Sequence, residues 1–300
     1  MSKKKSSMPK KYKLYFYGFW IIFFSGIIGL TGMFYAASEG YLGEMPDFRQ
    51  LENPKTNLAT QIISSDNKIL GKFHFGENRI PIQFEDLPKN LVDALISTED
   101  ERFYSHSGID FKATLRAIVF LGKRGGASTI SQQLARQLFV GIRSKNLFEA
   151  LSQKFKEYVI AVRLERQYTK HEIISMYLNI YDFGYNGDGI KSASNIYFDK
   201  ELDSLSIEES AMLVGMLKNS SYYNPLRRPE LVKSRRNVVF NQMQKNGHLD
   251  QKTVDSLKQI PLSVDYTPQS HREGLATYFR AYLQSFMKDW TSKNLKKDGS

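Results

Sequence analysis

The stretch STEDERFYSHSGID, residues 97–110, ends an apolar-periodic segment and gathers unusual chemistry in one turn. Glu99, Asp100 and Glu101 place three acids in a row, and two aromatic residues, a histidine and Gly108 follow them. Adjacent carboxylates repel, so a partly buried one has a raised pKa, which suits a base working near neutral pH. Taken alone, a helix end with solvated acids is the simpler interpretation, and both interpretations stay open.

The segments on either side predict a mainly α protein. Apolar residues recur at helical spacing, and Ser/Thr residues followed by Glu three positions later mark helix starts. Apolar periodicity predicts helices over residues 87–99, 152–168, 208–218 and 234–247. The cap pattern predicts that helices also open at Thr169 and at Ser206. Upstream, residues 61–84 hold short apolar runs around turn residues 65–67, which predict a small β-hairpin.

The N-terminal region predicts a membrane anchor. Residues 14–37, LYFYGFWIIFFSGIIGLTGMFYAA, form 24 residues without a charge. As a helix they would span roughly 36 Å, enough for the hydrocarbon core of a bilayer. Lysines crowd residues 1–13, so the positive-inside rule places the N-terminus in the cytoplasm and the rest outside. A cleaved signal peptide is the alternative, but the run is too long and no clear A-x-A site follows.

Charge and composition argue against several function classes. The net charge is +11, and removing the six lysines of residues 1–13 leaves +5 on the other 287 residues, so no nucleic-acid partner is expected. The absence of cysteine excludes disulfides, thiolate metal sites and a cysteine nucleophile. The five histidines are too scattered for a metal cluster, and no G-x-S-x-G, Walker A or H-E-x-x-H pattern occurs.

Two further stretches could carry chemistry. In GGASTISQQLARQLF, residues 125–139, hydroxyls and free amides at a helix start suit a phosphate, although an ordinary N-cap explains them too. In residues 152–168, Lys154 and Glu157 share a helix face. A cation and an acid facing a cleft would suit a glycosyl-phosphate leaving group, and a surface salt bridge is the simpler alternative.

In order and spacing these segments resemble the peptidoglycan glycosyltransferases over about residues 60–250. That family occurs as the N-terminal module of bifunctional class A penicillin-binding proteins and as monofunctional enzymes. The matching patterns are E-D-x-x-F-x-x-H-x-G at Glu99, Asp100, Phe103, His106 and Gly108, G-x-S-T-x-x-Q-Q from Gly126 to Gln133, K-x-x-E at Lys154 and Glu157, and R-R-N at Arg235, Arg236 and Asn237. The sequence departs from the family at Arg136, usually lysine, and at Gln153, usually arginine.

The resemblance implies a mechanism. The family polymerises lipid II, and Glu99 would be the general base that takes the proton of the acceptor GlcNAc 4-hydroxyl as it attacks C1 of the donor MurNAc. The anomeric centre inverts and undecaprenyl pyrophosphate leaves. Lys154 and Arg136 would stabilise the pyrophosphate, and Glu157 would position Lys154 or assist at the leaving group. The implied cleft residues are Asp100, Arg102, Ser128, Thr129, Gln132 and Gln133, and the implied structural residues are Phe103, His106, Gly108, Arg235, Arg236 and Asn237.

The resemblance also implies a fold and partners. The family fold is mostly α, with a lysozyme-like large lobe and a small membrane-dipping lobe, for which residues 138–150 are suited. No cofactor is obligatory, although the family sometimes uses a divalent cation, Mg²⁺ or Mn²⁺, at the pyrophosphate. The implied partners are lipid II, the growing glycan strand, the plasma (inner) membrane and proteins of the cell-wall synthesis, divisome or elongasome machinery.

The expected organisation has five parts. They are a cytoplasmic basic tail (1–13), a transmembrane helix (14–37), a juxtamembrane linker (38–60), the glycosyltransferase domain (61–250) and a linker (251–300). No S-x-x-K, S-x-N and K-T-G set is assembled, so these residues hold no transpeptidase domain. We expect the front part of a bifunctional class A protein, with a monofunctional enzyme as the alternative. A lysozyme-like hydrolase or lytic transglycosylase and a non-catalytic cell-wall scaffold are the rival functions.

Overall fold

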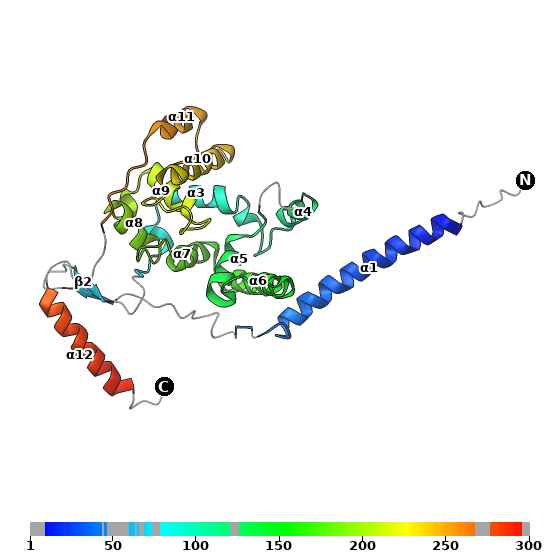
Figure 1. Cartoon of the computed structure of the whole chain (residues 1–300), viewed down its shortest axis with the longest axis horizontal. Helices are drawn as coiled ribbons and strands as arrows, with labels where there is room; N and C mark the ends of the chain where they lie inside the picture. The colour runs from blue at the N-terminus through cyan, green and yellow to red at the C-terminus, as the bar shows by residue number, and fades with distance from the viewer. Residues whose placement is uncertain are drawn as a thin grey trace, which may run out of the picture.

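The computed structural model describes residues 10–43, 45–46, 60–63, 65, 69–73, 79–120, 126–267 and 277–295. Figure 1 shows a helical body from which a long first helix projects. In chain order the helices and strands are α1 (Lys10–Ser38), β1 (Thr60–Ile63), β2 (Ile69–Phe73), α3 (Lys89–Glu99), α4 (Phe111–Val119), α5 (Ile130–Ala135), α6 (Leu147–Gln167), α7 (Lys170–Ile180), α8 (Ile190–Phe198), α9 (Ile207–Met216), α10 (Pro229–Lys245), α11 (Gln251–Gln259) and α12 (Thr277–Leu295). The basic tail up to residue 9 and most of the expected 38–60 linker lie outside the described residues.

Helix α1 is apolar and exposed along most of its length. Its stretch Lys11–Ser38 is long and apolar enough to cross a membrane, and most of its aromatic and aliphatic side chains are exposed. Its C-terminal end contacts the body, where the ring of Phe34 meets that of Phe155 edge-on at 4.9 Å. Arg163 also donates to the backbone oxygen of Ser38 at 3.2 Å. The apolar helix is thus fixed to α6, which carries part of the candidate site.

The body is mainly α, as expected, and one apolar core joins its helices. α10 packs against α3, α9 and α11, whereas α5 packs against α6 and α7. The rings of Phe103, Tyr177 and Phe240 are fully buried in this core. The capping boxes at Thr169 and Ser206 are confirmed, since each hydroxyl accepts the backbone amide of the glutamate three residues later.

Two helices begin earlier than their apolar pattern indicates. α6 starts at Leu147 because the side chain of Asn146 accepts the amides of the first turn. α10 starts with Pro229, whose fixed φ and missing amide hydrogen suit a first helical position.

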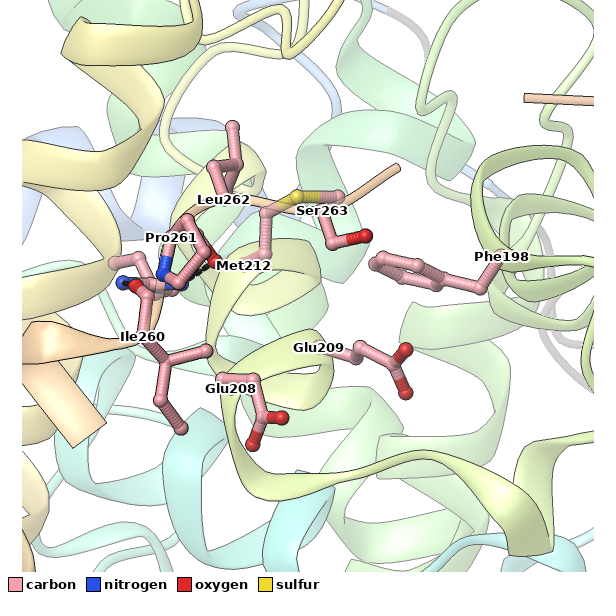
Figure 2. A pocket seen from close by; sticks show the side chains of 9 residues that line it. Phe198, Glu208, Glu209, Met212, Ile260, Pro261, Leu262 and Ser263 are labelled. Carbon is pink, nitrogen blue, oxygen red and sulfur yellow. Dashed lines mark hydrogen bonds between the residues drawn. The ribbon is translucent and has the colours of Figure 1, made fainter. Parts of the chain in front are cut away.

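The packed body continues past residue 250, where the linker was expected to begin. Val254 and Leu257 of α11 are buried in the core. Farther on, the amides of Asp265 and Thr267 bond to backbone oxygens at the end of α8, each at 2.9 Å. Residues 260–263 of this segment line a small open pocket of about 40 Å³, together with residues of α8, α9 and α10 (Figure 2). The pocket is lined by Phe198, Glu208, Glu209, Met212, Arg236, Ile260, Pro261, Leu262 and Ser263.

The strands β1 and β2, which lie between α1 and α3 along the chain, pair antiparallel, and β2 lies beside α12 (Figure 1). Thr60 lies opposite Phe73 and Ile63 opposite Ile69, with an irregularity in register between Ile62 and Ile63.

Exposed apolar side chains gather on α4 and around the start of α6. They are Phe111, Leu115, Ile118 and Val119 on α4, and Ile142, Leu147, Phe148 and Leu151 in and after the segment expected to dip into the membrane. Within that segment Leu138, Phe139 and Val140 pack against the core instead. Contact of this region with a bilayer stays a prediction.

Candidate active site

Glu99 is the last residue of α3, and its carboxylate is largely withdrawn from solvent. Gln133 of α5 donates its side-chain N–H to Glu99 Oε2 at 2.9 Å. On the other side, a guanidinium nitrogen of Arg235 lies 3.7 Å from Glu99 Oε1. The first and the last of the expected segments, far apart in sequence, therefore meet at this carboxylate.

The surroundings of Glu99 make it a better proton acceptor than an exposed glutamate. Burial raises its pKa, since a carboxylate loses hydration there, and the neighbouring charge of Asp100 adds to this. The hydrogen bond from Gln133 and the charges of Arg235 and Lys218 act in the opposite direction. The net result is a pKa above the ordinary glutamate value, as a base needs near neutral pH.

Asp100 has partners different from those of Glu99 and is held by the protein itself. His106 Nε2 lies 3.0 Å from both of its carboxylate oxygens. The backbone amide of Ile130, the first residue of α5, also donates to Asp100 at 3.1 Å. A carboxylate at a helix N-terminus satisfies a free amide and complements the helix dipole. Asp100 and His106 thus attach the 97–110 stretch to α5.

Gly108 brings the same stretch against α6. Its φ of +90° belongs to the left-handed region, and a Cβ there would lie 2.9 Å from the carbonyl of Ala161. The carbonyl oxygen of Gly108 accepts the Thr129 hydroxyl at 2.7 Å and the Gln132 side-chain N–H at 3.1 Å. Thr129 is also the N-cap of α5, so both side chains are fixed by buried contacts.

Lys154 and Glu157 form an ion pair on the buried side of α6. Lys154 Nζ lies 2.7 Å from Glu157 Oε2, and it also donates to Ser128 Oγ at 2.9 Å and Gln132 Oε1 at 3.1 Å. Burial lowers the pKa of Lys154, while Glu157 opposes that change. The ammonium therefore has three protein acceptors and remains near the residues that begin α5.

Arg136 directly follows α5 and starts a short π-helical segment that ends at Val140. Among the described residues its guanidinium makes no hydrogen bond or ion pair, although its charge is felt at Lys154. A cation without a protein partner beside a paired cation can accept an anionic ligand without first breaking an internal bond.

Several of the predicted site residues are held by contacts within the protein. Arg102, expected in the substrate cleft, forms a two-pronged pair with Asp110, the N-cap of α4. Phe103 is fully buried, and Arg236 is buried with its guanidinium donating to the carbonyl oxygens of Ile260 and Pro261. Oδ1 of Asn237 is buried and accepts no hydrogen bond among the described residues. Arg235, expected to be structural, reaches Glu99 instead.

Sequence reasoning missed residues that support the site from behind. Tyr177 of α7 donates its hydroxyl to Gln133 Oε1 at 2.9 Å. Lys170 bonds to the carbonyl oxygen of His106 at 2.7 Å and to Glu165 at 2.8 Å, and Glu165 also accepts the Ser131 hydroxyl. These residues lie within helical apolar patterns, where a tyrosine or a single charge indicates a core or surface position and gives no signal of a site.

The described residues include no group of three or more His, Asp or Glu side chains that could hold a metal ion. Around Lys154 the described residues supply one carboxylate, Glu157, which is paired with the ammonium at 2.7 Å. A divalent cation at the pyrophosphate stays a prediction.

Comparison with known proteins finds one family model and several similar proteins. The family model described as Transglycosylase matches residues 66–244. Penicillin-binding protein 1A of Pseudomonas aeruginosa is 34% identical over 265 residues, covering 85% of this chain and 31% of the relative. Penicillin-binding protein 1A of Escherichia coli K12 is 35% identical over 228 residues, covering 74% and 26%. The chain thus spans less than a third of the length of these relatives.

A crystal structure of penicillin-binding protein 1A from Haemophilus influenzae also matches, with a TM-score of 0.42 and 23% sequence identity. The match covers 78% of this chain and 24% of that chain.

Proposed function

Because the chain belongs to the transglycosylase family, whose model covers residues 66–244, we propose that it is a membrane-anchored peptidoglycan glycosyltransferase. Its reaction would join lipid II units into β-1,4-linked GlcNAc-MurNAc strands in bacterial cell-wall synthesis. The observation that carries the proposal is the pair of opposed charged groups held by α5. Gln133 bonds to the acid Glu99, and its neighbour Gln132 bonds to the cation Lys154.

Glu99 supplies the base for the attacking group. Its raised pKa favours proton transfer from a sugar hydroxyl, and the carboxylate remains ionised when the pH exceeds that pKa. As the acceptor 4-hydroxyl of GlcNAc loses its proton to Glu99, its oxygen attacks C1 of the donor MurNAc. A single displacement of this kind inverts the anomeric centre.

Lys154 and Arg136 stabilise the opposite end of the reaction. The departing pyrophosphate gains negative charge, and fixed cations withdrawn from water stabilise such charge without reorganisation. Lys154 is already oriented by Ser128, Gln132 and Glu157. Glu157 therefore acts by holding the ammonium in place, while Arg136 provides the cation that has no internal partner among the described residues.

The lipid substrate explains the anchor and the exposed apolar surface. Undecaprenyl-linked substrate stays in the bilayer, so the enzyme must work at its surface. α1 would cross the plasma membrane once with the basic tail in the cytoplasm, and Ile142, Leu147 and the exposed side chains of α4 would touch the outer leaflet. Proteins of the cell-wall synthesis, divisome or elongasome machinery are the expected protein partners.

The decisive experiment measures glycan polymerisation from labelled lipid II in liposomes, with the full chain and with Glu99→Gln. We expect polymer from the wild type and none from the variant. Glu101→Gln is the matched control, because Glu101 is two residues away and pairs with Lys245 at the surface. A wild type that leaves lipid II intact would overturn the proposal, and one that shortens glycan instead would identify a hydrolase or lytic enzyme.

A further inference from the structure

The phenol of Tyr177 is fully buried behind the candidate base. Its hydroxyl donates to Gln133 Oε1 at 2.9 Å, and Gln133 Nε2 donates to Glu99 Oε2 at 2.9 Å. We propose that Tyr177 is a positioning residue for the base, acting through Gln133 to keep an N–H donor directed at the Glu99 carboxylate. The inference rests on the glycosyltransferase function proposed above.

The hydroxyl decides which way the Gln133 amide points. An ionised carboxylate only accepts hydrogen bonds, so Gln133 must present its NH₂ group to Glu99. A reversed amide would place its oxygen against Glu99, an arrangement that suits only the protonated acid. The reversed NH₂ group could donate to the phenol oxygen of Tyr177, but the phenolic hydrogen would then have lost its acceptor, and a buried donor without an acceptor is unfavourable. Tyr177 therefore disfavours the orientation that stabilises protonated Glu99.

Tyr177 can perform this role at every relevant pH. Burial raises the pKa of its phenol well above the ordinary tyrosine value, and the Glu99 charge raises it further. The hydroxyl thus stays protonated and remains a donor.

Several groups surround Glu99, and among the described ones the Gln133 amide is the group whose orientation depends on Tyr177. The titratable, charged and polar groups that act on it are Asp100 beside it, Gln133 of α5, Tyr177 and Tyr181 at α7, Lys218 after α9 and Arg235 of α10. The two cations act directly and would be unchanged by removal of the Tyr177 hydroxyl. The amide is the group whose orientation would change.

The test compares Tyr177→Phe with Tyr197→Phe. Tyr197 is also fully buried, and its hydroxyl donates to the carbonyl oxygen of Phe183 at 2.8 Å, outside the site. Without the directed N–H, the carboxylate loses a stabilising hydrogen bond, so we expect the pKa of Glu99 to rise by about one unit in Tyr177→Phe. A base with a raised pKa is protonated over more of the acid range. kcat/KM should therefore fall about tenfold on the acid limb and recover at alkaline pH.

A structural role would look different, because a misfolded or loosened site loses activity at all pH values. Tyr197→Phe should leave the acid limb in place. The pathway is tested by combining Tyr177→Phe with Gln133→Ala. If Tyr177 acts through Gln133, the hydroxyl has no further effect on the pKa once the amide is gone. An equal shift in that background would overturn the proposal.

A second readout separates this inference from the proposed function. Carbon-13 NMR of glutamate carboxyls in the full detergent-solubilised chain gives the pKa of Glu99, assigned by its loss in Glu99→Gln. If the wild type polymerises lipid II but Tyr177→Phe leaves both the pKa and the acid limb unchanged, the positioning role is wrong. If the wild type does not polymerise, the glycosyltransferase function fails, and the NMR shift still decides whether Tyr177 controls the Glu99 proton.

Discussion

Gln132 and Gln133 are neighbours in α5, yet their side chains hold opposite parts of the candidate site. Gln132 Oε1 accepts from Lys154 Nζ at 3.1 Å, and Gln133 Nε2 donates to Glu99 Oε2 at 2.9 Å. Both glutamines are buried, and Gln132 is also tied to the carbonyl oxygen of Gly108. One short helix therefore sets the positions of Glu99, the proposed base, and Lys154, the proposed cation, so damage to α5 or its cap should affect both.

Lys154→Met should lower the rate of polymerisation strongly while the protein still folds. Removing a preorganised cation at the leaving group costs about 10²–10³ in kcat, by analogy with the loss of one oxyanion donor. Lys154→Arg should recover only part of this, because a planar guanidinium cannot match three acceptors arranged around one ammonium. Initial rates with labelled lipid II measure both effects.

Lys156→Met is the control for Lys154, since it removes the same charge from the same helix outside the site. Equal losses in the two variants would show that net charge at the membrane, and not the placed ammonium, explains the effect.

Glu157→Gln should destabilise the protein by leaving Lys154 partly buried without its acid. Breaking one side of a buried pair costs about 3 kcal/mol in the free energy of unfolding. The pKa of Lys154 is already lowered and would fall further without Glu157. Because the folded-state pKa of Lys154 lies below its unfolded value of about 10.4, the unfolded chain binds more protons between these two values. The stability that Glu157→Gln loses relative to the wild type should therefore shrink as the pH rises toward about 10.4.

Denaturant unfolding of Glu157→Gln between pH 7 and pH 10 measures this deficit. The double variant Lys154→Met/Glu157→Gln removes the stranded charge and should recover part of the stability. The ion-pair explanation would be contradicted if the stability loss of Glu157→Gln did not change with pH. It would also be contradicted if the double variant lost more stability than the two single variants added together.

The family motifs pointed to candidate site residues, but not to the partners of those residues. Glu99, Gln133, Lys154 and Glu157 could be selected because four motifs in order resemble the family, whereas the spacing of each stretch alone left a simpler interpretation open. Arg102 matched the same stretch, but its pairing with Asp110 depends on how the turn folds back onto α4. No spacing rule predicts the geometry of such a turn.

The helices were predictable where caps and apolar periodicity agree, as at Thr169 and Ser206. Tyr177 could not be selected as a site residue from sequence. Its position fits the apolar face of α7, and only the tertiary contact with Gln133 separates it from an ordinary core tyrosine.

Gly108→Ala should destabilise the protein through both strain and collision. A left-handed φ costs a residue with a Cβ about 1 kcal/mol, and here the new methyl would also lie 2.9 Å from the backbone of Ala161. Gly247→Ala is the control that separates these two causes, because its φ is +79° but nothing lies within 4 Å of the added Cβ. Thermal unfolding should therefore give a larger loss for Gly108→Ala.

Gly108→Ala should also lower activity at temperatures where the protein is still folded, since the Gly108 carbonyl orients Thr129 and Gln132. Equal stability losses at the two glycines would show that α6 moves away from the added methyl at little cost.

Asp110→Asn should lower the free energy of unfolding near neutral pH, and the loss should shrink at acidic pH. Burial raises the pKa of Asp110, but the amide of Ala113 and the guanidinium of Arg102 outweigh it, so the net pKa is lowered. A carboxylate with a lowered folded-state pKa stabilises the fold above its unfolded value of about 3.9, and this stability is lost as the pH falls through the folded value. Loss of the pair and of the charged cap should cost about 1 kcal/mol at pH 7.

Urea unfolding at pH 7 and at about pH 3 checks the Asp110 effect. The gap between wild type and Asp110→Asn should narrow at the lower pH, where the wild-type carboxyl begins to take up its proton. Asp250→Asn is the control, because Asp250 also caps a helix but is exposed and has no arginine partner among its contacts. If the stability difference between wild type and Asp110→Asn widened on acidification, the Asp110 carboxylate would not have a lowered pKa in the folded protein.

The orientation of α1 can be tested cleanly because the chain has no cysteine. Ser6→Cys marks the basic tail, and Ser204→Cys marks an exposed position on the body. With one crossing and the lysines inside, a membrane-impermeant maleimide should label Ser204→Cys in spheroplasts and should label Ser6→Cys only after permeabilisation. Replacing Lys3, Lys4, Lys5, Lys10, Lys11 and Lys13 by glutamine should weaken this preference, since those charges hold the tail inside. Labelling of Ser6→Cys in intact spheroplasts would place the body in the cytoplasm, away from an extracytoplasmic glycan strand.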